Sequence, residues 1–591
     1  MSKSTLAGGY DTRPDIGLRM AYPRVIFFYT LGLCTCLALL GFATFKPGSV
    51  SAFAGDSLFV LNFAKTYMNG DGFRINPNMG FPGVQDNAFF PSFDFSYRLV
   101  LRLIAPFVSN VFVAYYLLQL LGAATMFLAA AFALRRLGFR HWLAIVGAIV
   151  FVVSPYYSWR ILGGHDFLAL YFSVPLGAAL ALGIGSWRPE MTVRAFAASA
   201  TALVMLGIIA TSGLYYAFFS MLFIAFTGLI GAAATRRVAP LVAVLISVAI
   251  VFPVLVVTGF GSALGDVISG AMPTIKRSAS TQLILGLNLA EATYVFKDIK
   301  PLRWAFVDFD SVRNQLSGVV SYEWPGLFLT ATIFASPVLL AISGVVETNR
   351  STWIKLIYIS SACLVFGIIF SVNGGLAYYF NLFIAPQIRA TARIMPFLAF
   401  FALVVVLAGI EMLLVAGSAL YTALAVAAIA ALILSMVPSV NGFARNQDAN
   451  ASQVVEKTRQ MLAAKDRAQI SAVLQLPYAQ WPEPPAFIRT FSPYSHEEAF
   501  VLDRKGSTTK WSYGAAPYQP SWTAVGNVVV QHAKSGLAPA AAGLGFDAIL
   551  IEKRAYDDAE MQILRANIEA DRTCKLFEDD LRVLYHIGST C

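Results

Sequence analysis

Apolar runs long enough to cross a lipid bilayer recur along this chain from Val25 to Val440. A hydrocarbon core of about 30 Å needs about 20 residues of helix, because backbone amides left unpaired in lipid are too costly. Of the 591 residues, 57% are hydrophobic and only 13% are charged, which excludes an ordinary soluble protein. The sequence therefore predicts a polytopic α-helical membrane protein with about eleven transmembrane helices.

The positions of the basic residues indicate the membrane topology, and this topology accounts for most of the net charge of +10. They gather in alternate short breaks between the apolar runs: Arg135, Arg136 and Arg140; Arg188 and Arg194; Arg236 and Arg237; Arg350 and Lys355. The positive-inside rule places such breaks in the cytoplasm. We therefore expect a cytoplasmic N-terminal tail, a C-terminal domain outside, and no nucleic-acid partner, because the tail after Val440 mixes both signs of charge.

The domain boundaries follow from the change in composition after Ser439, where apolar density drops and charge rises. The expected parts are a tail over 1–23, a transmembrane domain over 24–440 and a small extracytoplasmic α/β domain over 441–591, with outer loops over 46–97, 259–325 and 372–393. The segment 98–110 is apolar but short, which indicates an interfacial helix. In the tail, Cys574 and Cys591 predict a disulfide if this part faces an oxidising compartment.

The first outer loop places Asp56 just beyond the first span, at the start of an amphipathic helix. A carboxylate at this water interface can take a proton from a sugar hydroxyl. The alternative interpretation is an N-cap, which would satisfy the free amides of the helix whatever the protein does. The two roles are compatible.

Several short motifs lie at outer positions of the chain. They are Gly55-Asp56, Ala64, Gly70-Asp71, Phe81-Pro82-Gly83 through Asp86 and Pro91, Gly163-Gly164-His165, Tyr322-Glu323-Trp324-Pro325-Gly326, Arg389 through Arg393, Leu474 through Pro477, and Gly545 through Ile551. In this layout the chain resembles the lipid-linked-sugar glycosyltransferases of the GT-C fold, including bacterial members with a C-terminal extracytoplasmic domain. The likeness covers nearly the whole chain, although no single motif is highly specific.

The resemblance implies transfer of a sugar from a polyprenyl-phosphate donor to an acceptor hydroxyl, with one carboxylate as general base. Asp56 is the first candidate for this catalytic role and Asp86 is the second. Asp86 also fits a solvated loop residue after a Pro-Gly turn. The loop lacks the Asp-Glu pair of some family members, so neither the subfamily nor the base follows from the motif.

Two further outer positions are candidates for substrate binding. His165 follows two glycines at the outer end of a span and could bind the donor phosphate or a sugar, or else cap the helix that begins at Asp166. Glu323 lies between Tyr322 and Trp324, and an aromatic belt explains these neighbours but not the acid. We therefore predict a substrate-binding role for Glu323.

Arg389 and Arg393 are predicted to bind the donor phosphate. They lie four residues apart, so a helical segment would present both on one face, and no acid falls between Val372 and Arg393. A planar guanidinium binds phosphate oxygens in a two-pronged geometry that lysine cannot copy. The alternative is that the pair anchors to lipid headgroups.

The sequence indicates no cofactor and no metal site. It has no glycine-rich phosphate loop after a strand and no metal-ligand spacing of histidine or cysteine. Asp308 and Asp310 form an isolated Asp-x-Asp in an outer loop, which two solvated acids explain as well. The residues neither indicate nor exclude a divalent metal.

The leading functional hypothesis is a glycosyltransferase of the cytoplasmic (inner) membrane, acting on its outer face. Its expected partners are a polyprenyl-phosphate-linked sugar, membrane lipids, and a cell-envelope glycan or lipid acceptor such as a polysaccharide or lipopolysaccharide. The alternative is a transporter or flippase of lipid-linked saccharide, and a third possibility is a membrane scaffold with a binding tail. A transporter would place ionisable residues or broken helices at mid-membrane, whereas the acids here concentrate in outer loops.

Overall fold

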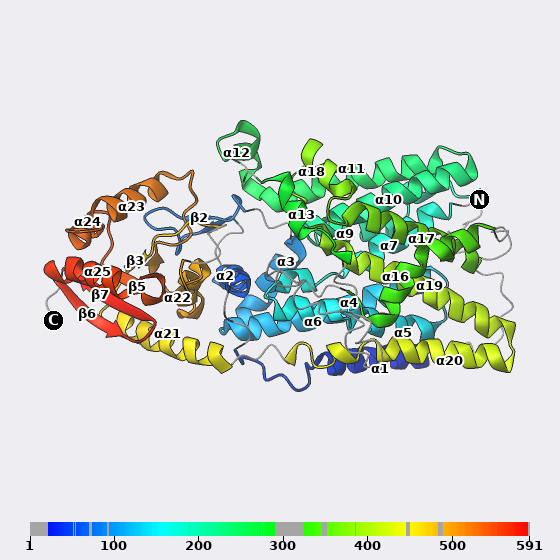
Figure 1. Ribbon diagram of the computed structural model, residues 1–591, viewed down its shortest axis with the longest axis horizontal. Coiled ribbons are helices and arrows are strands. Elements are labelled where there is room, and N and C mark those ends of the chain that lie inside the picture. The colour runs from blue at the N-terminus through cyan, green and yellow to red at the C-terminus, as the bar shows by residue number, and fades with distance from the viewer. Residues whose placement is uncertain are drawn as a thin grey trace.

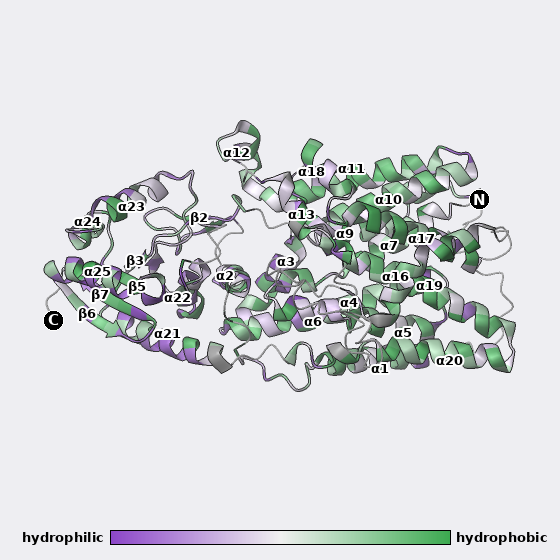
Figure 2. Ribbon diagram, viewed as in Figure 1, coloured by the Kyte–Doolittle hydropathy of each residue, from purple (hydrophilic) through white to green (hydrophobic). Residues whose placement is uncertain are grey.

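The protein consists of a helical bundle and a domain built on a β-sheet, which follow one another along the long axis (Figure 1). The computed structural model describes residues 22–50, 53, 55–69, 74–90, 94–187, 190–273, 275, 277–289, 324–345, 352–384, 386–444, 449–482 and 488–588. Figure 2 shows that the bundle is mostly hydrophobic and that the sheet domain is mixed.

Seven helical segments in the described part are long and apolar enough to cross a membrane, and four shorter apolar helices accompany them. Together they agree with the predicted number of about eleven spans. The main helices of these eleven segments, of which α5 and α6 together make up one, are α1 (Tyr22–Leu40), α4 (Val111–Arg136), α5 (His141–Val152), α6 (Pro155–Leu162), α7 (Ser173–Gly185), α9 (Ala200–Ala210), α10 (Leu214–Thr235), α11 (Ala239–Phe260), α16 (Leu327–Val345), α17 (Thr352–Ser371), α19 (Met395–Ala416) and α20 (Ala419–Leu434). The predicted polytopic fold is confirmed.

The apolar runs over 142–157 and 166–185 are each predicted from the sequence as one span, but both are interrupted near the end of the bundle that faces the sheet domain. The span predicted over 142–157 divides into α5 and α6, because Ser154 caps a new helix whose first residue is Pro155. The span predicted over 166–185 begins as a short 3-10 helix, η2 (Asp166–Ala169), and continues as α7. These breaks position a loop over 163–165 against the first outer loop.

The predicted interfacial segment is α3 (Phe95–Ile104), an amphipathic helix with Leu99 and Leu103 exposed and Leu101 buried. One face therefore packs on the bundle, while the other presents large apolar side chains outward. This is the pattern expected of a helix that lies along a membrane surface.

The sheet domain has a mixed five-stranded sheet in the order β4-β3-β5-β7-β6. The strands are β3 (Ala472–Leu476), β4 (Lys510–Trp511), β5 (Ala548–Glu552), β6 (Thr573–Glu578) and β7 (Arg582–Ile587). β4, β3 and β5 are parallel, and β7 pairs antiparallel with both β5 and β6. The stretches over 472–476 and 546–551, whose apolar character predicts strands, form β3 and β5, and the terminal hairpin predicted from 575–577 and 582–586 is formed by β6 and β7.

Helices cover both faces of this sheet, because successive strand residues point to opposite sides. Val473 and Leu550 pack against α21 (Ala449–Arg467) and α22 (Glu497–Leu502). Leu474 and Ile549 pack on the other face, against α23 (Pro520–Gln531), α24 (Leu537–Gly543) and α25 (Asp558–Ala570). The result is a three-layer α/β/α domain.

The sheet continues onto the first outer loop of the bundle. Trp511 donates its backbone N–H to the carbonyl of Asn78 at 2.8 Å, and Phe81 donates its N–H to the carbonyl of Trp511 at 3.0 Å. Met79, between them, is fully buried in the core of the sheet domain. The first outer loop therefore forms part of the sheet domain's own structure, which fixes the domain on the bundle.

Cys574 lies on β6 and is disulfide-bonded, whereas Cys34, Cys36 and Cys363 are free. The predicted partner, Cys591, lies outside the described residues.

Candidate active site

Asp56 is the first residue of α2 (Asp56–Met68), the helix of the first outer loop. Gly55 occupies the N-cap with a φ of 54°, a left-handed conformation that costs glycine little. Asp56 is therefore not the cap itself, although an acid in the first turn still meets the positive end of the helix dipole. Its side chain is 49% exposed, so a substrate can reach the carboxylate.

The loop between α6 and η2 brings His165 onto Asp56. Gly164 has a φ of +75° and packs so closely on the start of α2 that a Cβ would come within 2.7 Å of the Ser57 hydroxyl oxygen. Only glycine fits this turn without strain. Nε2 of His165 consequently lies 3.1 Å from Oδ2 of Asp56. Within the described residues the imidazole makes no helix-capping hydrogen bond.

The surroundings of Asp56 favour its ionised form. Partial burial raises the pKa of the carboxyl, but the hydrogen bond with His165 and the electrostatic effects of His165 and Arg393 outweigh burial, so the net shift is downward. Asp56 is therefore a carboxylate at neutral pH. A base must be deprotonated before it can accept a proton.

Arg389 and Arg393, the two predicted phosphate-binding residues, do not lie together on one helix. Arg393 lies in the short 3-10 helix η7 (Thr391–Ile394), while Arg389 lies before it in a segment without regular structure. The expected single helical face is therefore absent from this described segment. The Arg393 guanidinium stacks over the Tyr215 ring at 4.2 Å, which holds it at the start of α10.

Asp56, His165, Arg389 and Arg393 all line one cavity of about 740 Å³. Its volume lies in the range of small-molecule sites, and most of its remaining lining is aromatic or aliphatic. The cavity combines two carboxylates, Asp56 and Asp94, one histidine and three arginines, Arg277, Arg389 and Arg393, with mostly apolar walls. This combination can bind an anionic group and remove a proton within one space.

Asp86 lies in a separate network on the short strand β2 (Gln85–Asp86). Arg74 donates to its carboxylate at 3.1 Å, and the Tyr518 hydroxyl of the sheet domain donates at 3.2 Å. Arg74 also pairs with Asp266, on α12 (Leu264–Ser269), at 2.6 Å. Asp86 is buried, and both of its oxygens are engaged, so it connects the first loop, the second loop and the sheet domain.

Asp166 is a buried acid for which the sequence predicts no functional role. Its side chain is fully buried, and the Tyr115 hydroxyl of α4 donates to Oδ1 at 2.6 Å. Asp166 fixes the loop that carries His165. Its position directly after Gly-Gly-His was the available signal.

The predicted Glu323, and the pair Asp308 and Asp310, lie outside the described residues.

No protein-family model and no curated protein sequence matches the chain. Among solved structures, it is similar to the arabinofuranosyltransferase AftD from Mycobacteria, at 14% sequence identity and a TM-score of 0.50. The superposition covers 97% of this chain but only 40% of AftD. The chain has the GT-C fold.

Two further solved structures are less similar to this GT-C chain. The oligosaccharyltransferase of Archaeoglobus fulgidus, in complex with zinc and sulfate, has a TM-score of 0.44 at 12% identity, with 91% of this chain and 70% of that chain covered. ArnT from Cupriavidus metallidurans, bound to undecaprenyl phosphate, has a TM-score of 0.39 at 11% identity, with 96% of this chain and 98% of that chain covered.

Proposed function

We propose that this protein is a membrane glycosyltransferase, which transfers a sugar from a polyprenyl-phosphate donor to an acceptor hydroxyl on a cell-envelope glycan or lipid. The observation that carries the proposal is the single cavity shared by the Asp56–His165 pair and by Arg389 and Arg393. The GT-C fold supports the same reaction class. The first outer loop, which resembles that of the family, supplies the carboxylate.

The roles follow from the chemistry of glycosyl transfer. The acceptor oxygen forms a bond to the anomeric carbon of the donor, and the bond from that carbon to the phosphate oxygen breaks. The phosphate leaves with the electron pair, and the acceptor proton passes to Asp56. Arg389 and Arg393 stabilise the negative charge on the leaving phosphate, while His165 holds the carboxylate in place.

The position of the cavity supports a site on the outer face of the inner membrane. α4 ends at Arg135 and Arg136, and Arg236 and Arg237 follow α10, so these basic residues lie at the helix ends remote from the cavity. The positive-inside rule assigns the arginine-rich end to the cytoplasm. The cavity and the sheet domain then face the extracytoplasmic side.

The charges in the bundle do not favour the flippase alternative. Among the described residues of α1, α4 to α7, α9 to α11, α16, α17, α19 and α20, Glu411 is the only acid, and it pairs with Arg140 at 3.1 Å near the arginine-rich end of the bundle. Asp166 lies before α7, in the short helix η2 next to the cavity. A transporter of charged substrates would place such groups on a path through mid-membrane. The accessible acids of the cavity instead lie at one surface.

The proposal is tested with purified protein in lipid nanodiscs, a panel of polyprenyl-phosphate-linked sugars as donors, and a cell-envelope extract of glycans and lipids as acceptor. We expect release of polyprenyl phosphate from one of these donors. Glycan analysis of the envelope from a deletion strain and its complemented form should then reveal one missing sugar. If the protein cleaves no donor and the envelope glycans are identical, the proposed function is wrong.

A further inference from the structure

Three aromatic side chains, Phe59, Phe90 and Tyr494, form a continuous wall of the cavity. The ring centroids of Phe59 and Phe90 lie 5.3 Å apart, and those of Phe59 and Tyr494 lie 6.0 Å apart. All three rings are partly exposed. Phe59 and Phe90 belong to the first outer loop, whereas Tyr494 comes from the sheet domain.

This aromatic wall lies beside the carboxylate. Asp56 and Phe59 are three residues apart on α2 and both line the cavity, so they share one face of the helix. A molecule that packs on Phe59 therefore lies within about one helical turn of the base.

The Tyr494 ring is held firmly by its own domain. It lies on the short 3-10 helix η10 (Pro493–His496), and its hydroxyl donates to the Pro482 carbonyl at 3.0 Å. The next helix, α22, packs on α2 and so fixes the ring relative to Phe59. Because the hydroxyl is used within the domain, Tyr494 presents chiefly its apolar ring to the cavity.

We propose that Phe59, Phe90 and Tyr494 form the acceptor subsite and that the acceptor is a saccharide. This inference rests on the proposed function. A sugar ring carries C–H groups on its faces and hydroxyls around its edge. It can therefore pack a face on an aromatic ring while a hydroxyl points at Asp56. The sheet domain thereby takes part in substrate binding.

The donor sugar has the same chemistry, but two observations assign the wall to the acceptor. The base must contact the acceptor hydroxyl, and Phe59 lies three residues after Asp56, on the same face of α2. Tyr494 belongs to the domain whose residues are mixed in hydropathy rather than mostly hydrophobic (Figure 2), and a water-borne glycan arrives from the side of that domain. A lipid-linked donor arrives from the bundle instead.

The test uses the full chain in nanodiscs and compares Tyr494→Ala, Tyr494→Phe and Trp522→Ala. Trp522 stacks on Tyr478 at 4.5 Å in the same domain and does not line the cavity, so it controls for general damage to that domain. We expect Tyr494→Ala to raise the KM for acceptor about three- to tenfold while the KM for donor stays at its wild-type value. Tyr494→Phe keeps the ring and should behave as wild type.

A binding measurement tests the subsite without turnover. Saturation-transfer NMR with a panel of methyl pyranosides and methyl furanosides should give signals from ring C–H protons with wild type, Tyr494→Phe and Trp522→Ala, and weak signals with Tyr494→Ala. Equal binding by all variants overturns the subsite. A rise in donor KM with acceptor KM unchanged overturns its assignment to the acceptor. Failure of wild type to cleave any donor contradicts the proposed function, whereas active enzyme that is indifferent to Tyr494→Ala contradicts only this inference.

Discussion

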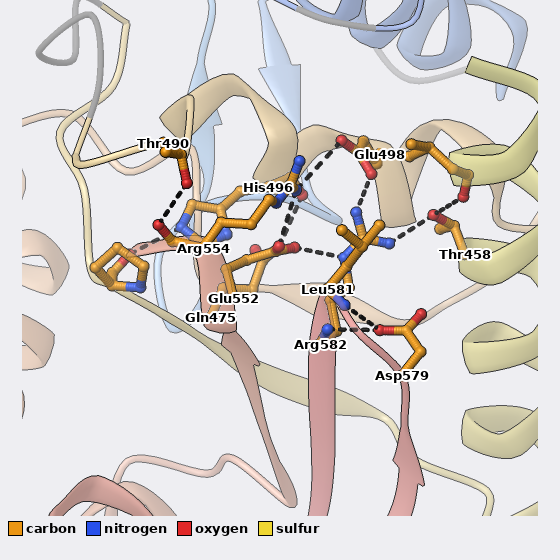
Figure 3. Close-up of polar contacts among 12 residues, drawn as sticks. Thr458, Gln475, Thr490, His496, Glu498, Glu552, Arg554, Asp579, Leu581 and Arg582 are labelled. Carbon is orange, nitrogen blue, oxygen red and sulfur yellow. Dashed lines mark hydrogen bonds and ion pairs between the residues drawn. The ribbon is translucent and has the colours of Figure 1, made fainter. Parts of the chain in front are cut away.

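Two groups of acids and bases in this protein have opposite surroundings. In the cavity, Asp56 and His165 are 49% and 36% exposed. In the sheet domain, Arg582 contacts Glu498 and Glu552, and all three side chains are 1% or 2% exposed (Figure 3). The first group faces a space large enough for a substrate, while the second is enclosed by its own partners.

The difference separates charges that serve chemistry from charges that serve structure. The Arg582 network joins β7, β5 and α22, and Arg554 adds a contact to Glu552 at 3.0 Å. Its charges are already neutralised, so they cannot attract a substrate. The cavity charges retain exposed surface and can attract one. Variants in the cavity should therefore change the rate of sugar transfer, whereas variants in the Arg582 network should change the stability of the sheet domain.

The largest effect is expected for Asp56→Asn. The amide keeps the size of the side chain but cannot accept a proton, so transfer should fall by about 10²- to 10⁴-fold while insertion and unfolding are unchanged. Initial rates of polyprenyl phosphate release measure this. Asp580→Asn, at an exposed ion pair with Lys457, is the matched control and should retain full activity. Near-normal turnover of Asp56→Asn would remove Asp56 as the base.

Arg582→Met should act on stability instead. It leaves Glu498 and Glu552 buried without their main cation, which typically costs about 3–5 kcal/mol. Hydrogen exchange followed by mass spectrometry on the full chain should show lost protection in β5 and β7, with the bundle unaffected. Protection equal to wild type would mean that the network does not hold the domain together.

Arg389→Lys and Arg393→Lys test whether the cavity arginines bind the donor phosphate or only anchor to lipid headgroups. Lysine keeps the positive charge but loses the two-pronged geometry, so we expect the KM for donor to rise by about tenfold or more. Simple anchoring to lipid headgroups needs only the charge. If both variants used the donor with wild-type KM and kcat, the arginines would not be phosphate ligands.

Glu497 lies between the two groups, on α22 against α2, and its titration provides a further test. Burial raises the pKa of its carboxyl from 4.5 to about 8, with Asn62 and Asp56 nearby on α2. Between these values the folded chain holds a proton that the unfolded chain has lost. Stability should therefore fall as pH rises from about 5 to about 8, by at most about 1.4 kcal/mol per pH unit. The penalty is absent at low pH and complete above the folded pKa.

Glu497→Gln cannot ionise and should remove this pH dependence. Thermal unfolding of wild type and variant at a series of pH values measures it, with Glu560→Gln, an exposed residue of α25, as the control. Parallel pH profiles for wild type and Glu497→Gln would show that Glu497 is not the titrating group.

The site residues differ in how much of their role could be predicted from the sequence around them. Asp56 was found because a carboxylate at the start of a loop helix is a local pattern. Asp86 shared the same loop pattern, but it meets Tyr518, which lies 432 residues further along the chain. The contact of His165 with Asp56 likewise depends on the way the Gly164 turn packs on α2. Such pairings leave no signal in either segment alone.

The sequence by itself determined the membrane architecture, the strands and hairpin of the sheet domain, and the loop that carries Asp56. Each of these follows from a local requirement: a helix in lipid must satisfy its own backbone, and a strand must alternate its side chains. Only the tertiary structure decided which charges meet at the cavity and which are enclosed in the sheet domain. It also decided that Tyr494 completes a wall begun by Phe59. Those outcomes depend on packing between segments far apart in the chain. The geometry of these contacts, and not the local sequence pattern, determines which arrangement of the segments has the lowest free energy.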